Sequence, residues 1–491
     1  MEKIKALAKQ TVWYGLSSMI GRFLFFILTP LHTLALGTSN YGNTTKLYSY
    51  LAIFQVFLMF GLETGFFRFS NKYKEKFRII YSTAFWFVLL SASLFLFFTL
   101  QFDKSLISFL EIGKHSFLFY ITIFILFFDI INALPFAKLR LENRPVKYAL
   151  INVISIVISV LINIFFLWIC RVAFNTNPDS FFGSLYNPDH VLLYVFGANL
   201  VMSLIKSILL YREFLGLKIT FSIRYFIEMF KYSFPILLVG LFGAFNDNVE
   251  KILIPELINA EDPVSELGIY GANFKLSVLM VLFIQMFRYA AEPFFFSNAK
   301  DKNSKTLYAD VMKYFIIVGL IIFMGVTFYI DIFKYFIAEP FWAGLSIVPI
   351  LLIAKLFYGI FFSLSVWYKV SDHTRFGAIT AFIGFILTIV LNLLLIPKFG
   401  YFGSAIAMLT CYVVMVSLSY LFSIKYFKIP YDFKRILFYF VLTSILYVIN
   451  SYIPEIHFLI QYIISGFLIL VFIFVVYQKE FKNLIRYKHE S

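Results

Sequence analysis

Charged residues are scarce in this chain, and cysteine is nearly absent. Only 14% of the 491 residues are Asp, Glu, Lys or Arg, against roughly 25% in an ordinary soluble domain. The hydrophobic share is 61%, and the mean hydropathy is +0.85. A soluble fold has too little interior for so much apolar surface, so we expect a polytopic membrane protein. Cys170 and Cys411 predict neither a disulfide framework nor a metal site.

Two sequence signals that would indicate other classes are also missing. No G-x-x-x-x-G-K-[ST] loop occurs, which excludes a built-in P-loop ATPase. The first ten residues, "MEKIKALAKQ", are basic and lead into an apolar run that is too long for a signal-peptide core. Because no convincing A-x-A cleavage site follows, we expect an uncleaved first membrane span.

Long apolar runs divide the chain into fourteen expected membrane helices. A helix that crosses a bilayer needs about 20 mostly apolar residues. Such runs lie near 11–36, 47–67, 79–101, 116–137, 148–170, 191–210, 232–254, 267–290, 314–336, 342–367, 376–396, 401–424, 436–453 and 457–477. An even number of spans places both termini on one side of the membrane.

The distribution of Lys and Arg indicates which side that is. The segments expected inside are 1–10, 68–78, 138–147, 211–231, 299–313, 368–375, 425–435 and 478–491, and together they hold 30 of the 42 basic residues. The segments expected outside, 37–47, 102–115, 171–190, 250–266, 331–341, 397–400 and 452–457, hold 7. By the positive-inside rule both termini are cytoplasmic, in a multi-pass protein of the cytoplasmic membrane. The net charge of +15 is thus mainly a topology signal, and no nucleic-acid partner is expected.

A seven-residue motif occurs twice in the chain. "YGNTTKL" at 41–47 returns as "YGANFKL" at 270–276, an offset of 229 residues. Further matches at nearly the same offset pair Pro30 with Pro255, Ser70-Asn71 with Ser297-Asn298, and Asn163 with Asn392. Collinear matches at a nearly constant offset predict an internal duplication.

The offset covers six expected helices, so equivalent helices run in the same direction. That spacing predicts an all-α membrane fold of two six-helix lobes related by a pseudo-two-fold axis along the membrane normal. The expected parts are an amino-terminal lobe with its cytoplasmic linker (1–231), a second lobe (232–424), and two further helices with a tail (425–491). Two similar bundles that enclose a cavity are typical of alternating-access transporters.

Several stretches carry a family resemblance that covers most of the chain. They are "TVWYGLSSMIGRFLFFILTPLHTLALGTSNYG", "GLETGFFRFS", "NDNVEKILIP" followed by "LGIYGANFKLSVL", and "LNLLLIPKFGYFGSAIA". In their order and spacing the chain resembles the multidrug/oligosaccharidyl-lipid/polysaccharide (MOP) exporter superfamily, and within it the oligosaccharide flippases of polysaccharide biosynthesis. Fourteen spans fit that branch and the lipid II branch better than the MATE branch, which usually has twelve. The segment 171–190 is longer than the family's usual short turn.

The resemblance implies a function as well as a fold. A flippase of this kind moves a polyprenyl-pyrophosphate-linked oligosaccharide from the inner to the outer leaflet by alternating access, and it is not an enzyme. The implied partners are the lipid-linked oligosaccharide, membrane lipids and the polysaccharide polymerase machinery. No bound cofactor is implied, and a proton or sodium gradient is the candidate energy source.

Basic residues inside the spans are candidates for substrate binding. An ionisable group at mid-bilayer costs at least ~2.5–3.5 kcal/mol on insertion scales, so each one needs a reason. Arg22 lies about one third of the way along the first span, where a guanidinium fork would suit a pyrophosphate. The alternative is that Arg22 snorkels to the inner surface. Arg68, Lys251 and Arg288 are weaker candidates. For Arg68, at the end of span two, the alternative is that it is simply a topology residue.

Acidic residues inside the spans are candidates for ion coupling or gating. Glu63 and Asp129 are lone acids, and each either carries a coupling proton or sodium ion or makes an interhelical hydrogen bond. Asp247 and Glu250 precede Lys251 late in span seven, and the Glu250–Lys251 pair is similar to an acidic–basic pair of the family. Glu292 lies four residues after Arg288, so the two share a helix face. That pair either supports the helix or opens and closes a cavity mouth.

Two other functions remain open at this point. A MATE-type ion-coupled exporter of small cations would be expected to have carboxylates in its amino-terminal cavity, whereas the first span has Arg22 and no acid. A membrane glycosyltransferase or O-antigen polymerase usually has a catalytic acid or Arg in a sizeable outer loop. The longest outer segment here has about twenty residues and no paired catalytic spacing.

The topology generates a direct test. Intact cells that carry Phe182→Cys or Ala260→Cys should react with a membrane-impermeant thiol reagent, because both positions are expected outside. Lys74→Cys should stay unlabelled until the cells are permeabilised. The parent protein, whose two native cysteines lie in or next to apolar runs, gives the background. Labelling at 74 together with protection at 182 and 260 would show that the orientation is inverted.

Overall fold

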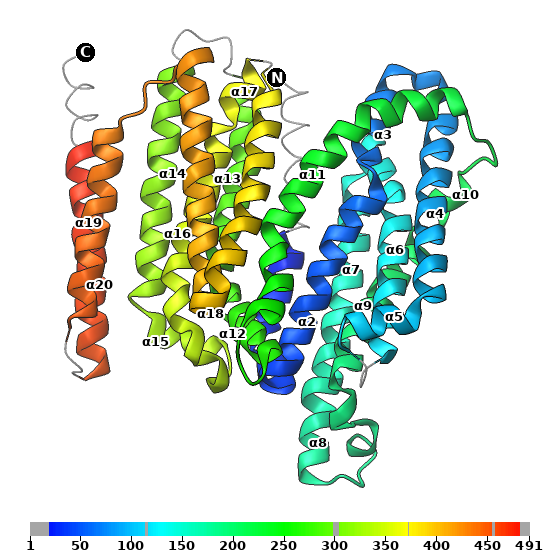
Figure 1. Ribbon diagram of the computed structural model, residues 1–491, viewed down its shortest axis with the longest axis horizontal. Helices are drawn as coiled ribbons and strands as arrows, with labels where there is room; N and C mark the ends of the chain where they lie inside the picture. The colour runs from blue at the N-terminus through cyan, green and yellow to red at the C-terminus, as the bar shows by residue number, and fades with distance from the viewer. Residues whose placement is uncertain (1–18, 113–115, 298–303, 372, 454–456, 482–491) are drawn as a thin grey trace. The chain divides into compact units, whose positions relative to one another are not determined.

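The computed structural model describes residues 19–112, 116–297, 304–371, 373–453 and 457–481, and every regular element in these ranges is helical (Figure 1). Eleven of the described helices are long and apolar enough to cross a membrane. The number rises to twelve if the bent pair Pro263–Leu276 and Val278–Ala291 is one span. The expectation of an all-α membrane protein is confirmed.

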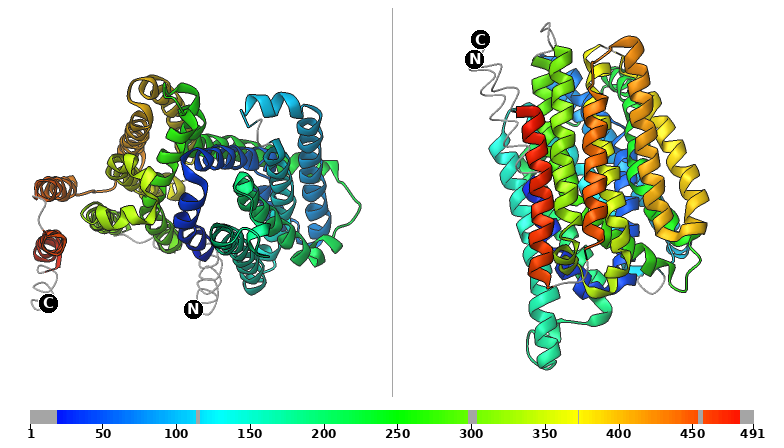
Figure 2. Two further views of the ribbon diagram at one scale, coloured as in Figure 1. Left: turned by 90° about the horizontal axis from the view of Figure 1, so that it is seen from below. Right: turned by 90° about the vertical axis from the view of Figure 1, so that its left-hand side faces the viewer.

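Two of the long helices are broken at a glycine, where the backbone is not helical. Helix α18 (Arg375–Tyr426) has 52 residues, which corresponds to about 78 Å, whereas the hydrocarbon core is about 30 Å thick. It turns at Gly400, whose φ of 58° lies in the left-handed region that glycine tolerates. Its two legs, drawn from yellow to orange in Figure 2, contain the expected spans 376–396 and 401–424.

Helix α2 (Thr29–Met59) has the same kind of break at Gly37, where φ is 68°. This break lies where the sequence placed the end of its first span. The total of fourteen spans stays a prediction, because residues 11–18 of the first expected span (11–36) are not among the described residues.

The chain forms two compact units, and the first comprises residues 1–271. Its other helices are α3 (Leu62–Lys72), α4 (Phe77–Gln101), α5 (Asp103–Phe109), α6 (Ser116–Leu141), α7 (Pro145–Ile164), α8 (Arg171–Thr176), α9 (Val191–Leu209), α10 (Tyr211–Leu215), α11 (Ile223–Leu257) and most of α12 (Pro263–Leu276). Helix α6 packs against α4, α7 and α9, while α11 packs along α2 and α3. Leu62, Phe66, Tyr81 and Leu134 form part of the apolar core.

The glycines in and next to the repeated motif have a packing role in this unit. A Cβ added at Gly42 of the first copy would lie 1.9 Å from the carbonyl oxygen of Val264, and one at Gly268 would lie 1.9 Å from that of Thr38. A Cβ at Gly271 in the second copy would lie 2.6 Å from the Thr45 hydroxyl oxygen. Glycine at these positions therefore lets the backbones of α2 and α12 touch, so the first copy packs against the helix that carries the second.

The second unit comprises residues 272–491. Its helices are α13 (Val278–Ser297), α14 (Ser304–Thr327), α15 (Ile330–Phe333), α16 (Val348–Leu364), α17 (Val366–Val370), α18, α19 (Phe433–Ser451) and α20 (Phe458–Val476). Helix α16 lies at its centre and packs against α13, α14 and α18. The expected division of the chain at 231/232 and 424/425 was based on the repeat and stays a prediction, while the packing of α11 on α2 and α3 assigns that helix to the first unit.

The matched asparagines have the same local structure in the two units. The side-chain amide of Asn163 donates to the Ser159 carbonyl oxygen at 2.8 Å, and that of Asn392 donates to the Thr388 carbonyl oxygen at 2.7 Å. Both side chains are buried. This shared detail agrees with a duplication, and the superposition of whole lobes stays a prediction.

Candidate functional site

Arg22 lies in the helical stretch 19–27 of the first unit, and its side chain is exposed. A Cβ added at the neighbouring Gly21 would lie 2.6 Å from the Ile156 side chain, so this stretch is closely packed against α7. Within the described residues, no carboxylate lies within ion-pair distance of the Arg22 guanidinium. A guanidinium fork is suited to an anionic ligand such as a phosphate.

Arg68, near the end of α3, is held by an aromatic ring. Its guanidinium lies over the ring of Tyr232 on α11, 4.1 Å from the ring centroid. A cation–π contact of this kind contributes about 0.5–1 kcal/mol at an exposed site and leaves the charge unneutralised. Arg68 is exposed, and no acid of the described residues pairs with it. Among the described residues of the first unit, Arg22 and Arg68 are thus two cations without an acidic partner.

Glu63 is not the lone acid that the sequence suggested. Its carboxylate pairs with Arg140 near the end of α6, and both side chains are about one third exposed. The Arg140 guanidinium also lies 5.0 Å from the centroid of the Phe67 ring. Because an ion pair already neutralises Glu63, this residue is a weaker candidate for a coupling ion.

Asp129 lies near the middle of α6, is half-buried and belongs to a polar network between α6 and α9. The Ser203 hydroxyl donates to an Asp129 carboxylate oxygen at 2.7 Å. The Asn132 amide donates to the Ser203 carbonyl oxygen at 3.0 Å, and the Ser207 hydroxyl donates to the Asn132 side-chain oxygen, also at 3.0 Å. The expected interhelical hydrogen bond of Asp129 is therefore present. A cationic partner within 4 Å is absent among the described residues.

The acidic–basic pair late in α11 is also present. The Lys251 ammonium lies 3.2 Å from a Glu250 carboxylate oxygen and also donates to the Asp247 backbone oxygen. Glu250 is buried, and neither of its carboxylate oxygens accepts a hydrogen bond from the described residues. A buried carboxylate held by one ammonium and no hydrogen bonds is poorly stabilised. Pro255 follows about one turn later in the same helix.

Arg288 lies in the second unit, on α13. Its guanidinium is 4.4 Å from the centroid of the Phe362 ring, and the Lys369 ammonium is 4.7 Å from the same centroid. Phe362 is thus shared by two cations. The side chain of Glu292 lies outside the described residues, so its pairing with Arg288 stays a prediction.

Several buried charges among the described residues were not singled out from the sequence. Glu213 of α10 is 1% exposed, and the Lys147 ammonium lies 2.8 Å from its carboxylate. Glu480 accepts from the Lys313 ammonium at 2.8 Å and from the Tyr439 hydroxyl at 2.7 Å. These acids lie near helix ends, where sequence reasoning treated charges as topology signals only.

Another of these buried charges is Lys355 of α16, which is 4% exposed. Its ammonium lies 4.9 Å from the Phe274 ring centroid, 5.6 Å from that of Tyr412 and 5.9 Å from that of Tyr358. Aromatic faces stabilise a cation at this depth by roughly 2 kcal/mol. The sequence located Lys355 inside a span, but only the packing of α16 brings the rings together.

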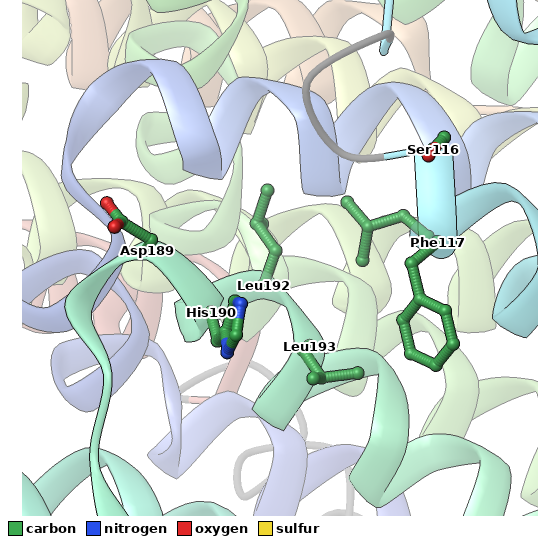
Figure 3. Close-up of a pocket in the computed structure, with 7 residues that line it drawn as sticks. Ser116, Phe117, Asp189, His190, Leu192 and Leu193 are labelled. Carbon is green, nitrogen blue, oxygen red and sulfur yellow. The ribbon is translucent and has the colours of Figure 1, made fainter.

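A small pocket of about 290 Å³ opens between the start of α6 and the start of α9. Figure 3 shows Ser116 and Phe117 on one side of it, with Asp189 and His190 on the other. Asp189 and His190 belong to the segment 171–190, which the sequence singled out for its length. The pocket contains none of the predicted site residues.

Comparisons with known proteins agree with this architecture. A family model described as polysaccharide biosynthesis protein matches residues 7–299. The solved structure of the lipid II flippase MurJ in its inward closed conformation is similar, with a TM-score of 0.70 and 17% identity, and the match covers 95% of this chain and 99% of that one. No curated protein matches the chain.

Two transporters of the MOP superfamily type also share the fold. The MATE multidrug transporter DinF-BH matches with a TM-score of 0.58 and 16% identity over 85% of this chain and 95% of its own. A MOP superfamily transporter from Pyrococcus furiosus matches with a TM-score of 0.54 and 13% identity over the same shares. The resemblance seen in the sequence, both to the superfamily and to its polysaccharide branch, is confirmed.

The Lys46–Glu256 pair of the first unit yields a stability prediction. The Lys46 side chain is 2% exposed and its ammonium lies 2.9 Å from the Glu256 carboxylate, which is 46% exposed. Glu256→Ala leaves a buried ammonium unpaired and should lower the unfolding free energy by about 2 kcal/mol. Lys46→Met leaves an exposed carboxylate and should cost less than about 1 kcal/mol.

Apparent Tm in detergent measures this difference. The double variant Lys46→Met/Glu256→Ala should have a Tm near that of Lys46→Met alone, because the buried charge is gone. A larger Tm loss for Lys46→Met than for Glu256→Ala would contradict the assignment of the buried partner.

Proposed function

Since the chain belongs to the polysaccharide biosynthesis protein family, we propose that it is a flippase for a polyprenyl-pyrophosphate-linked oligosaccharide. It moves this substrate from the inner to the outer leaflet of the cytoplasmic membrane by alternating access. The MurJ-like fold supports the proposal, since MurJ is a lipid II flippase. The family and the fold point to a transporter rather than an enzyme, and polysaccharide polymerase machinery is the expected downstream partner.

One observation about the charges of the first unit carries the proposal. Arg22 and Arg68 are exposed and have no carboxylate partner among the described residues. By contrast, Glu63, Glu250 and Glu256 each lie within ion-pair distance of a basic side chain. The open charge in these spans is therefore mainly positive, which suits an anionic headgroup and not a cationic drug.

The electrostatic attraction between these cations and a pyrophosphate is strong enough for recognition. A pyrophosphate carries about two negative charges, and at an effective dielectric of about 20 each unit pair at 4 Å attracts by roughly 4 kcal/mol. Desolvation of both partners offsets part of this. The polyprenyl tail stays in lipid, so only the headgroup and glycan need a polar path. Lys251 and Arg288 are proposed as weaker contributors, because each already contacts protein groups.

A MATE-type exporter of small cations is the second candidate, because MATE transporters share the fold. Such an exporter would attract its substrate with free carboxylates. The pairing of Glu63 and Glu250 disfavours this function, and Asp129 is the acid on which it would depend.

Substitution of Arg22 tests the proposal. Arg22→Ala should abolish surface glycan in a complemented deletion strain while protein levels stay normal, because the phosphate ligand is lost. Arg22→Lys should restore only part of the glycan, since the bidentate fork is missing. Arg224→Ala is the matched control and should leave export intact, since this exposed arginine contacts Glu228 one turn away and the neighbouring Tyr225 ring. Wild-type glycan from Arg22→Ala would end the claim that Arg22 handles phosphate.

A further inference from the structure

The linker that joins α10 to α11, residues 216–222, exposes large apolar side chains. Ile219 is 95% exposed and Phe221 is 48% exposed, while Leu215 before the linker and Ile223 after it are 78% and 63% exposed. A group of exposed apolar side chains in one short segment marks an interaction surface. In the predicted topology this segment lies on the cytoplasmic side, at the membrane surface. The bilayer is therefore the apolar phase next to it.

Hydrogen bonds hold the linker against α4 (Phe77–Gln101) of the same unit. The Lys218 backbone N–H donates to the Ser82 hydroxyl oxygen at 2.9 Å, and the Trp86 indole donates to the Lys218 carbonyl oxygen at 2.8 Å. The Ser222 backbone N–H donates to the Thr83 hydroxyl oxygen at 3.1 Å. The linker therefore has a defined position beside α4, where α11 begins (Figure 1).

An apolar groove of about 470 Å³ opens between α4 and the linker. It is lined by Trp86, Phe87, Leu89, Leu90, Ser93 and Phe221. The exposed apolar face of α4 continues from Leu90 through Leu94, Phe97 and Phe98. From residue 86 to residue 98 the helix rises by about 18 Å, and one leaflet of hydrocarbon is about 15 Å thick. The groove thus leads into an apolar stripe about as long as one leaflet is deep.

Two basic residues lie at the linker end of this groove. Residues at four-residue spacing share a helix face, and on α4 that spacing places Arg78 one turn before Ser82 and about two turns before Trp86. Lys218 is fixed at the same place by its backbone hydrogen bonds to α4. Both basic side chains are exposed, and no carboxylate of the described residues lies within ion-pair distance of either.

The surrounding segments are strongly basic as well. Segments 68–78 and 211–231 together hold nine basic residues and three acidic ones. Two of these acids are already paired, Glu213 with Lys147 and Glu228 with Arg224. The third is Glu75, which is exposed in the turn before α4. An apolar groove with a positive end suits a ligand that has apolar chains and a negative headgroup.

We propose that this groove binds an anionic phospholipid of the cytoplasmic leaflet. One acyl chain lies against Trp86, Phe87 and Phe221. The phosphate group lies near Arg78 and Lys218. The cytoplasmic leaflet carries the anionic lipids, and each Lys or Arg near its surface strengthens the attraction roughly fivefold. The bound lipid covers apolar side chains that the protein leaves exposed and stabilises the linker against α4. This site goes beyond the proposed function, because the transported substrate takes no part in it.

Trp86 reports directly on the occupant of the groove, because bromine atoms on an acyl chain quench tryptophan fluorescence on contact. The purified full-length protein is reconstituted in phosphatidylcholine vesicles that contain an equal fraction of either brominated phosphatidylglycerol or brominated phosphatidylcholine. Quenching that disappears in Trp86→Phe belongs to Trp86, and this variant keeps an aromatic ring in the groove. The Trp86 signal should show a preference for phosphatidylglycerol of roughly fivefold or more in relative affinity.

Charge variants separate a defined site from diffuse attraction to the membrane surface. Arg78→Gln/Lys218→Gln should bring the lipid preference of Trp86 close to one, while quenching by brominated phosphatidylcholine stays as in the parent. Lys74→Gln/Lys76→Gln is the matched control, because it removes the same charge from the turn before α4, and it should keep the preference. Equal quenching by the two lipids in the parent protein, or an equal loss of preference in the control, would overturn the proposal.

Photo-crosslinking supplies a second measurement that needs no substitution. A phosphatidylglycerol with a photoactivatable acyl chain should give adducts enriched in residues 86–93 and 215–223, located by peptide mass spectrometry. Adducts spread evenly over the exposed apolar faces, or none in these two segments, would show unselective lipid contact or a different occupant and would contradict the proposal. Arg22→Ala should keep the lipid preference of Trp86 whatever its effect on surface glycan, so the lipid site and the proposed function fail separately.

Discussion

The low dielectric of the bilayer is the constraint on which the rest of this structure depends. A charge inside a span must be paired, neutralised or directed at a ligand, because hydrocarbon does not solvate it. The first unit satisfies this requirement mainly between helices. Lys46 on α2 pairs with Glu256 on α11, and Arg140 on α6 pairs with Glu63 on α3. Such pairs connect helices that are distant in sequence.

The unpaired charges then become informative. Arg22 and Arg68 have no acidic partner among the described residues, and Asp129 has no basic one. Uncompensated charge of this kind is expected at sites that bind something from outside the fold. The positive charge of the two arginines suits the anionic headgroup of the proposed substrate.

Much of the fold could be predicted from the sequence, because hydropathy and helix length depend on local composition. The breaks at Gly37 and Gly400 lie at the expected span ends, and the repeated glycines mark a close helix crossing. The pairing of charges could not be predicted in the same way. Glu63 appeared to be a lone acid, because its partner Arg140 lies on a helix that is distant in sequence and only packing brings them together. The aromatic rings around Lys355 were missed for the same reason.

The central claim is that this protein moves a lipid-linked oligosaccharide across the cytoplasmic membrane. The most direct measurement is the leaflet distribution of that lipid in cells depleted of the protein, read with a membrane-impermeant reagent that modifies the glycan on spheroplasts and on inverted vesicles. If the protein is the flippase, the lipid-linked oligosaccharide accumulates on the cytoplasmic side of the depleted cells and reacts only in inverted vesicles. Accumulation on the outer side would contradict the account, because it would place the missing step after translocation.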